Sequence, residues 1–128
     1  MLTALKYSRK LSAFDHGIFF YHTIEEKRQV LFNFLKEGLD NQKGAVYVAG
    51  EESPRTIRKA MLNFGIDVKN LEREGLLTIV NYDKWYIVNG KVEIPKIVGL
   101  WEKACDKAEE KGLRGLHVCG EMDCFFPA

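Results

Sequence analysis

The chain has 128 residues, enough for one domain of ordinary size and too few for two. Apolar residues make up 46% and charged residues 29%, the balance of a globular protein that buries a core. The net charge is only +1, and a protein whose main partner is nucleic acid or a membrane surface usually carries a concentrated basic face, so neither partner is expected.

The sequence contains no apolar segment near the ~20 residues that span a bilayer, and residues 1–10 lack the apolar core of a secretory signal. Its three cysteines are an odd number without paired short spacing. Reduced thiols in the cytoplasm are therefore expected, with no metal and no cofactor.

The N-terminal half predicts two strand–helix units. Residues 1–12 are expected to form a flexible arm ahead of a domain spanning 13–128, and the β-forming residues 17–21 predict a buried first strand. Thr23 and Glu26 have the spacing of a capping box, which opens a helix that ends near Gly44. A second strand follows at 45–49. Ser53 and Pro54 then start a second helix, which Gly65 closes.

The C-terminal half continues the alternation of strands and helices. Residues 76–80 predict a third strand, and Asn89-Gly90 predicts the turn of a small hairpin formed by 85–88 and 91–93. Pro95 begins a long helix that ends at Gly112, and 116–119 form the last strand. The inward face of this helix is predicted to carry Ile97, Val98, Trp101, Cys105 and Ala108.

This order of elements predicts an α/β fold of three layers: a mostly parallel sheet covered by helices on both faces, plus the hairpin. Ligands of such sheets collect beyond the carboxyl ends of the strands, where helix caps also lie. The candidate ligand-binding residues at these ends are Tyr21, His22, Glu51, Glu52 and Glu121. Trp85 and Tyr86 are added because aromatic side chains line apolar ligand sites, although core packing explains them equally well.

Several segments resemble known families. The order of a Glu-Glu-Ser-Pro segment, "GID" and "LEREGLLTIV" resembles the RecA-type ATPases of the circadian-clock KaiC family. The segments "HGIFFYHTIEE", "FLKEGL", "VYVA", "WYIVNGKV" and "RGLHVCGEMD" resemble the MEDS sensory domain of methanogens, methylotrophs and the dichloromethane-responsive regulator. The resemblance implies a RecA-like sheet, and it adds His16 to the candidate ligand-binding residues.

The segment between the predicted first strand and helix lacks the glycines of a phosphate-binding Walker A loop, and it carries Glu25 and Glu26 instead. Lys27 falls near the position of the phosphate-binding lysine. Because two carboxylates would repel a triphosphate, tight ATP binding is not expected. Glu51 and Glu52 match the pair that activates water in the KaiC-like enzymes, but as acids in a first helical turn they also suit a structural role.

The resemblance implies a non-catalytic sensory domain of signal transduction or transcriptional regulation, with a small hydrocarbon-derived compound as ligand. The signal would pass to a regulatory output protein or to an output domain absent from this chain. A degenerate KaiC-like nucleotide-binding protein is the alternative. The chain stops soon after the last predicted strand, where RecA-like domains continue the sheet, so either truncation at the C-terminus or a homodimer is expected.

Overall fold

The computed structural model describes residues 4–6 and 17–121. A three-stranded parallel sheet has the order β2-β1-β5 and is formed by β1 (Gly44–Ala49), β2 (Leu77–Asn81) and β5 (Leu116–Gly120). All six residues of β1 are buried, as expected for the central strand of a sheet covered on both faces. The predicted α/β class and the parallel sheet are confirmed.

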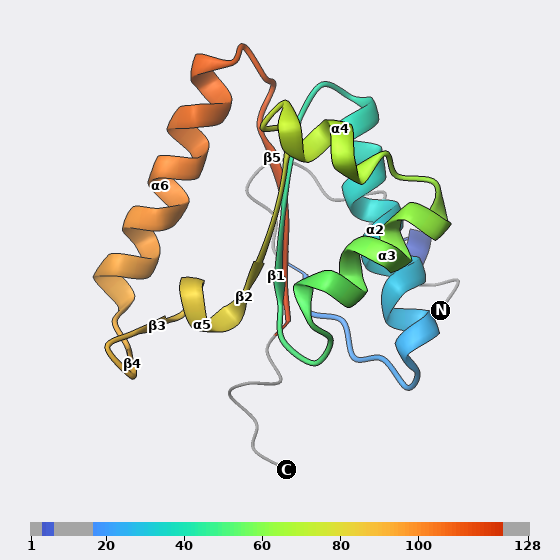
Figure 1. Cartoon of the computed structure of the whole chain (residues 1–128), viewed down its shortest axis with the longest axis horizontal. Coiled ribbons are helices and arrows are strands. Elements are labelled where there is room, and N and C mark those ends of the chain that lie inside the picture. Colours follow the sequence, from blue (N-terminus) through green and yellow to red (C-terminus); the bar gives the residue numbers. More distant parts are fainter. Residues whose placement is uncertain (1–3, 7–16, 122–128) are drawn as a thin grey trace.

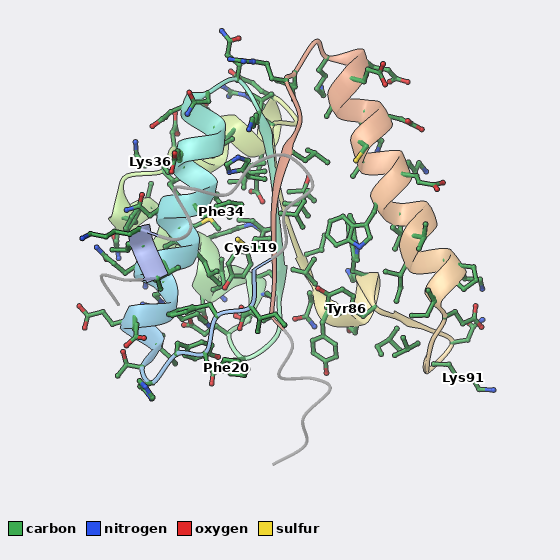
Figure 2. The ribbon with its side chains drawn as sticks, turned by 180° about the vertical axis from the view of Figure 1, so that it is seen from behind. Phe20, Phe34, Lys36, Tyr86, Lys91 and Cys119 are labelled. Carbon is green, nitrogen blue, oxygen red and sulfur yellow. The ribbon has the colours of Figure 1, made fainter. Side chains whose placement is uncertain are left out.

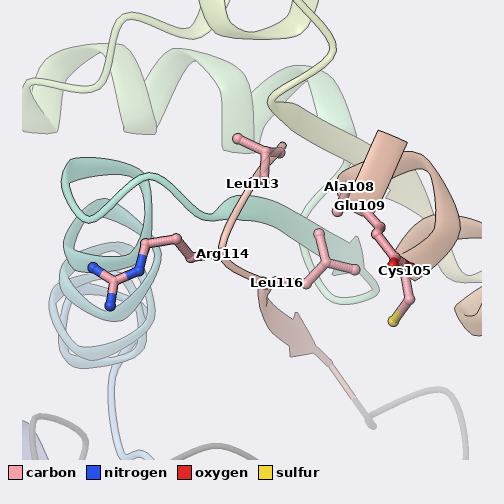
Figure 3. A pocket seen from close by; sticks show the side chains of 7 residues that line it. Cys105, Ala108, Glu109, Leu113, Arg114 and Leu116 are labelled. Carbon is pink, nitrogen blue, oxygen red and sulfur yellow. The ribbon is translucent and has the colours of Figure 1, made fainter. Parts of the chain in front are cut away.

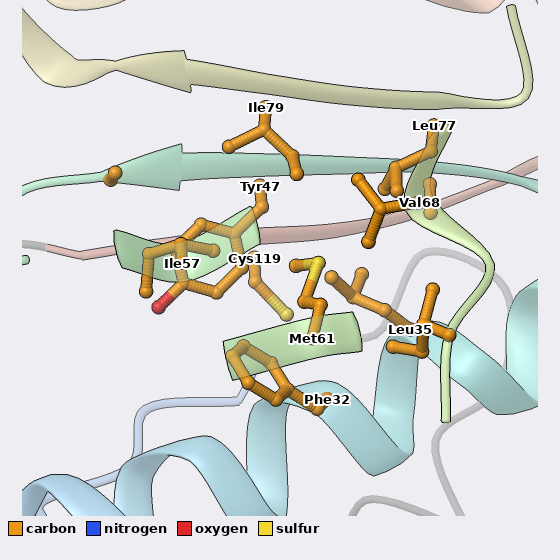
Figure 4. Close-up of a cluster of buried hydrophobic side chains, with 12 residues drawn as sticks. Phe32, Leu35, Tyr47, Ile57, Met61, Val68, Leu77, Ile79 and Cys119 are labelled. Atoms are coloured by element: carbon orange, nitrogen blue, oxygen red, sulfur yellow. The ribbon is translucent and has the colours of Figure 1, made fainter. Parts of the chain in front are cut away.

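One face of the sheet is covered by α2 (Ile24–Asp40), α3 (Pro54–Phe64) and α4 (Val68–Arg73), as Figure 1 shows. The larger part of the core lies in this layer, where Phe32 and Leu35 of α2 meet Ile57 and Met61 of α3 over Tyr47 (Figure 4). Each of these five side chains is at most 1% exposed.

The opposite face is covered by α5 (Tyr82–Trp85) and α6 (Ile94–Glu110), which flank the hairpin of β3 (Ile87–Val88) and β4 (Lys91–Val92). The hairpin turn is confirmed, because Asn89 and Gly90 have φ angles of 52° and 75°, as a type I′ turn requires. Its first strand is shorter than predicted. Trp85 ends a helix and Tyr86 follows it, so neither residue lies in the strand predicted at 85–88.

The helix starts follow from the capping residues. Thr23 Oγ1 accepts a hydrogen bond from the Glu26 backbone N–H at 3.1 Å, and Ser53 Oγ accepts one from the Thr56 N–H at 3.2 Å. Pro54 occupies the first turn of α3, and Gly65 ends this helix with a φ of 108°. Both helices therefore begin where the sequence predicts.

The strand predicted at residues 17–21 is wrong, because this segment belongs to neither a helix nor a strand. Ile18 and Phe20 are 86% and 84% exposed, whereas Phe19 and Tyr21 are half-buried. The segment thus keeps the alternating pattern of a strand without pairing in a ladder. Since β-forming side chains need a neighbouring strand to stabilise them, their presence alone does not fix the secondary structure.

The inward face of α6 also differs from the prediction. Val98 is 45% exposed and Cys105 is exposed, so both face away from the core. The residues of α6 that face inward recur at three- and four-residue intervals, as the helical period requires, and this spacing leaves out Val98. They are Ile97, Leu100, Trp101, Ala104 and Ala108. None of the described helices is long and apolar enough to cross a bilayer.

Candidate functional site

The carboxyl ends of β1 and β5 bring three glutamates to one edge of the sheet. Glu51 and Glu52 follow β1, and Glu121 follows β5 directly. Because β1 and β5 are paired in parallel, with Val48 opposite Gly120, these two strand ends lie side by side. The first turns of α2 place Lys27 against the same edge.

Lys27 is the centre of the cluster, and its side chain is fully buried. Its Nζ lies 3.0 Å from Glu121 Oε1, 3.1 Å from Glu52 Oε1 and 3.6 Å from Glu51 Oε1. An ammonium group has three N–H donors, and here three carboxylates surround it. A lysine becomes tolerable in a protein interior when it is paired in this way, since an isolated buried charge is very costly.

Glu121 is the most completely bonded carboxylate of the cluster and is only 5% exposed. Its Oε2 accepts a 2.7 Å hydrogen bond from the Tyr47 hydroxyl, and its Oε1 accepts one of 3.1 Å from the Glu51 backbone N–H. Burial raises the pKa of Tyr47 far above its ordinary value, and the neighbouring Glu121 charge adds to this. The phenol therefore stays protonated and acts as a donor.

Glu52 links Lys27 to Arg28, whose guanidinium forms two hydrogen bonds with this carboxylate. Burial by itself would raise the pKa of Glu52, but the hydrogen bonds from Arg28 and Lys27 together outweigh it and hold the pKa below the usual range. The cluster therefore contains two cations and three carboxylates, which gives it a formal charge of −1. Both cations form ion pairs within it.

Tyr21 covers the outer side of the cluster. Its hydroxyl donates to Glu51 Oε1 at 2.9 Å, and its ring centroid lies 5.8 Å from Lys27 Nζ, within the range of a cation–π interaction. Glu51 is the most exposed of the three carboxylates, with its side chain 41% accessible. The cluster is therefore most accessible to solvent at Glu51.

The structure brings together four of the predicted site residues: Tyr21, Glu51, Glu52 and Glu121. His22 is exposed, and His16 lies outside the described residues, as do Cys124 and most of the predicted N-terminal arm. Trp85 and Tyr86 are buried on the other face of the sheet, beneath α6; Figure 2 shows Tyr86 on that side, with Phe34 and Cys119 on the α2 side.

The predicted site residues did not include Lys27, Tyr47 or Arg28; Lys27 was noted only for its place near that of a phosphate-binding lysine. Tyr47 is the one residue with a polar side-chain group in the run Ala45–Ala49, and such a residue in a fully buried strand must find a partner for its hydroxyl. That signal was available. Arg28 carries no comparable signal, because an arginine near the start of a helix is more often solvent-exposed.

His117 and Cys119 lie two residues apart in β5, share one face of the sheet and both contact α2. The His117 ring stacks on Phe34 at 4.3 Å and its Nδ1 lies 2.9 Å from the Phe34 carbonyl oxygen, whereas Cys119 Sγ approaches the Leu31 carbonyl oxygen at 3.9 Å. Burial raises the pKa of the Cys119 thiol well above its ordinary value, so it stays protonated. Among the described residues, no three histidine, cysteine or acidic side chains are arranged to hold a metal ion.

A shallow pocket lies at the opposite end of the sheet, where α6 turns into β5 (Figure 3). Its lining mixes Cys105, Glu109, Leu113, Arg114 and Leu116. Glu109 and Arg114 are the only charged residues among the described residues that line it. The Lys27 cluster is the stronger candidate, because its groups converge on one buried atom.

The cluster is expected to make the stability of the domain depend on pH below about pH 4.3, the ordinary pKa of a glutamate in an unfolded chain. Because the pKa of Glu52 is lowered by folding, its contribution is fully present above that value and is lost as the pH falls through the lower folded pKa. Urea unfolding from pH 6 to pH 3 should show a flatter pH dependence for Glu52→Gln than for the wild type. Glu102→Gln, which removes an exposed carboxyl group from α6, should leave the wild-type slope unchanged.

The fold and the cluster together define a mixed α/β domain with carboxylates at the ends of two parallel strands and a buried lysine on the helix packed beside them. A family model described as the methanogen/methylotroph, DcmR sensory domain, MEDS, matches residues 15–128. The chain belongs to this family.

Curated relatives match parts of the chain. A UPF0273 protein of Pyrococcus furiosus is 34% identical over 82 residues, which are 56% of this chain and 33% of the relative. The circadian clock protein KaiC3 of Synechocystis is 32% identical over 78 residues, 58% of this chain and 15% of the relative. The chain thus spans a third or less of the length of these relatives. No solved structure gives a significant match.

Proposed function

We propose that this chain is a non-catalytic sensory domain that binds a small hydrocarbon-derived compound and passes the signal to a regulatory output protein or domain. Membership of a sensory-domain family supports the general role. The proposal that the domain is non-catalytic rests on the ion pairs of Lys27. Its ammonium is buried and surrounded by carboxylates, so the lysine nearest the expected phosphate position is already neutralised.

Hydrolysis of a nucleotide needs a cationic cradle for the phosphates and a carboxylate able to accept a proton from water. Arg28 is bonded to Glu52, and Lys27 is bonded to Glu121. If Lys27 and Arg28 turned to bind a triphosphate, the buried carboxylates would lose their counter-ions and lie beside another anion. The attraction of the two cations to the phosphates would have to exceed this electrostatic cost. This supports a domain that uses the charge cluster to hold its own elements together.

A degenerate nucleotide-binding protein remains the second candidate, because Lys27 and Arg28 lie at the start of the first long helix and the chain is similar to KaiC3. Isothermal titration calorimetry with Mg-ATP separates the two functions. The sensory proposal expects no binding up to millimolar concentration. A dissociation constant below 1 mM, lost in Lys27→Met, would overturn it in favour of nucleotide binding.

The ligand class is tested with a thermal-shift panel of dichloromethane, methanol, other one-carbon compounds and short hydrocarbon derivatives. A true ligand at 100 times its dissociation constant stabilises the folded state by about 2.7 kcal/mol. For a domain of this size that raises the melting temperature by roughly 10 °C. A panel without any shift would argue against hydrocarbon sensing.

We also propose that two copies associate through the sheet. Among the described strands, β5 pairs only with β1, and Val118 on it is 36% exposed. An exposed strand edge is a site where a second chain can add. Sedimentation equilibrium at micromolar concentration should give twice the monomer mass of 14.7 kDa, and a monomer mass would contradict this arrangement.

A further inference from the structure

The indole N–H of Trp85 has no hydrogen-bond partner in the part of the chain that the structure describes. Trp85 is only 8% exposed, and its Nε1 is the one buried side-chain nitrogen or oxygen in residues 4–6 and 17–121 that makes no hydrogen bond. Leaving a buried donor unpaired costs roughly 1–3 kcal/mol, and nearly all such groups in native proteins are paired. The missing acceptor therefore calls for an explanation.

Among the described residues, the surroundings of Trp85 are mostly apolar; the hydroxyls of Tyr82 and Tyr86 are the polar side-chain groups of this layer, and neither bonds to the indole. The indole packs on Val46 and Val48 of β1, and its ring centroid is 4.8 Å from that of Trp101 on α6. The other partly buried residues of this layer are mainly aliphatic or aromatic: Val80, Tyr82, Ile87, Ile97, Leu100, Ala104 and Leu116. The layer is an apolar, aromatic-rich environment around one unused donor, the composition of a site for a small organic ligand.

The helix that closes this layer is held weakly. Of the 17 residues of α6 only Ala108 is buried, whereas α2, of the same length, buries five. Ile94 and Val98 of α6 are 63% and 45% exposed. An element with so little buried surface opens at a lower free energy than the rest of the fold, so α6 can move to admit a ligand to Trp85.

We propose that the layer between α6 and the sheet binds the sensed compound, and that the Trp85 indole N–H donates a hydrogen bond to a single acceptor atom on an otherwise apolar, uncharged molecule. A charged ligand is excluded, because the described residues that make up this layer carry no charged side chain and an unpaired charge there would be prohibitively costly. This inference rests on the proposed sensory function and supplies its site and the chemistry of its ligand.

The two tryptophans of the chain, Trp85 and Trp101, both lie in this layer, so the indole region of a ¹H–¹⁵N NMR spectrum reports on the site alone. The probes are cyclopentanone and methylenecyclopentane, which share a shape and differ in the carbonyl acceptor. Cyclopentanone should move the Trp85 indole proton downfield in a saturable manner. Methylenecyclopentane should not move it downfield.

Trp85→Phe keeps an aromatic ring, although a smaller one, and removes the donor. It should weaken cyclopentanone binding about fivefold, the factor for one net hydrogen bond, and leave methylenecyclopentane binding unchanged. Trp101→Phe, the matched control, should preserve the downfield shift. The wild-type titration decides the question even if a variant folds poorly: an unmoved Trp85 signal, or one that shows only contact with a trapped water, overturns the proposal.

The two proposals fail in different ways. If a compound of the thermal-shift panel stabilises the domain while the Trp85 signal stays in place, the sensory function survives and this location is wrong. If cyclopentanone binds at Trp85 while the whole hydrocarbon panel is silent, the site stands and the proposed ligand class is wrong.

Discussion

Replacing Lys27 by methionine is expected to destabilise the domain by roughly 3–5 kcal/mol at pH 7, the usual cost of removing one partner from a buried ion pair. Methionine keeps the length and apolar character of the stem, so packing around it is little changed. The loss comes from Glu52 and Glu121, which stay buried without their shared cation. Urea unfolding followed by circular dichroism measures the free-energy difference.

The destabilisation by Lys27→Met should shrink as the pH is lowered toward 4. Without the ammonium, the buried carboxyls of the variant take up protons more readily, and neutral carboxyls cost less to bury. Lys36→Met is the control, since its ion pair with Asp40 is exposed and contributes at most about 0.5 kcal/mol. A pH-independent loss, or a loss no larger than that of the control, would refute the electrostatic role of Lys27.

Replacing Gly38 by alanine should destabilise the domain by about 1–3 kcal/mol, the range for overpacking a filled site. A Cβ at this position in α2 would lie 2.4 Å from the Cγ of the His117 ring on β5, far inside van der Waals contact. The His117 ring cannot move aside easily, because it is stacked on Phe34 and bonded to its carbonyl oxygen.

The sign of this effect is the informative part, because glycine to alanine within a helix normally stabilises by roughly 0.5–1 kcal/mol. Gly99→Ala provides the matched control: Gly99 lies in α6 and an added Cβ would meet no atom within 4 Å. Thermal unfolding should therefore move the melting temperature of the two variants in opposite directions. A stabilising Gly38→Ala would mean that α2 does not pack as closely on β5 as described.

The sequence predicted the elements whose signals are local. Thr23, Ser53 and Gly65 define helix ends through their own backbone and side chains, and the apolar run at 45–49 forms the central strand. The parallel order followed from the alternation of strands and helices. These features need no knowledge of distant partners.

The failures involve partners that the local sequence does not contain. Residues 17–21 have strand-forming side chains but make no ladder, and the first strand of the predicted hairpin is shortened by α5. At the site, the strand-end rule anticipated that Glu51, Glu52 and Glu121 lie together. Tyr21 lies beside them although the strand predicted to end at Tyr21 does not form. The rule could not place Trp85 and Tyr86, because α5, which ends at Trp85, carries them to the opposite face of the sheet.

The central strand β1 carries both of the arrangements described here, and its side chains alternate between them. Tyr47 faces the helices α2 and α3 and holds Glu121, whereas Val46 and Val48, its immediate neighbours, face Trp85. Tyr86 reaches the end of β5 from the far side, where its hydroxyl lies so close to Gly120 that any larger residue would collide with it. Gly120 therefore lies between the Tyr86 hydroxyl of the aromatic layer and Glu121 of the charge cluster, which follows it directly in the chain. The charge cluster and the aromatic layer thus lie on opposite faces of the same strand, separated only by its backbone.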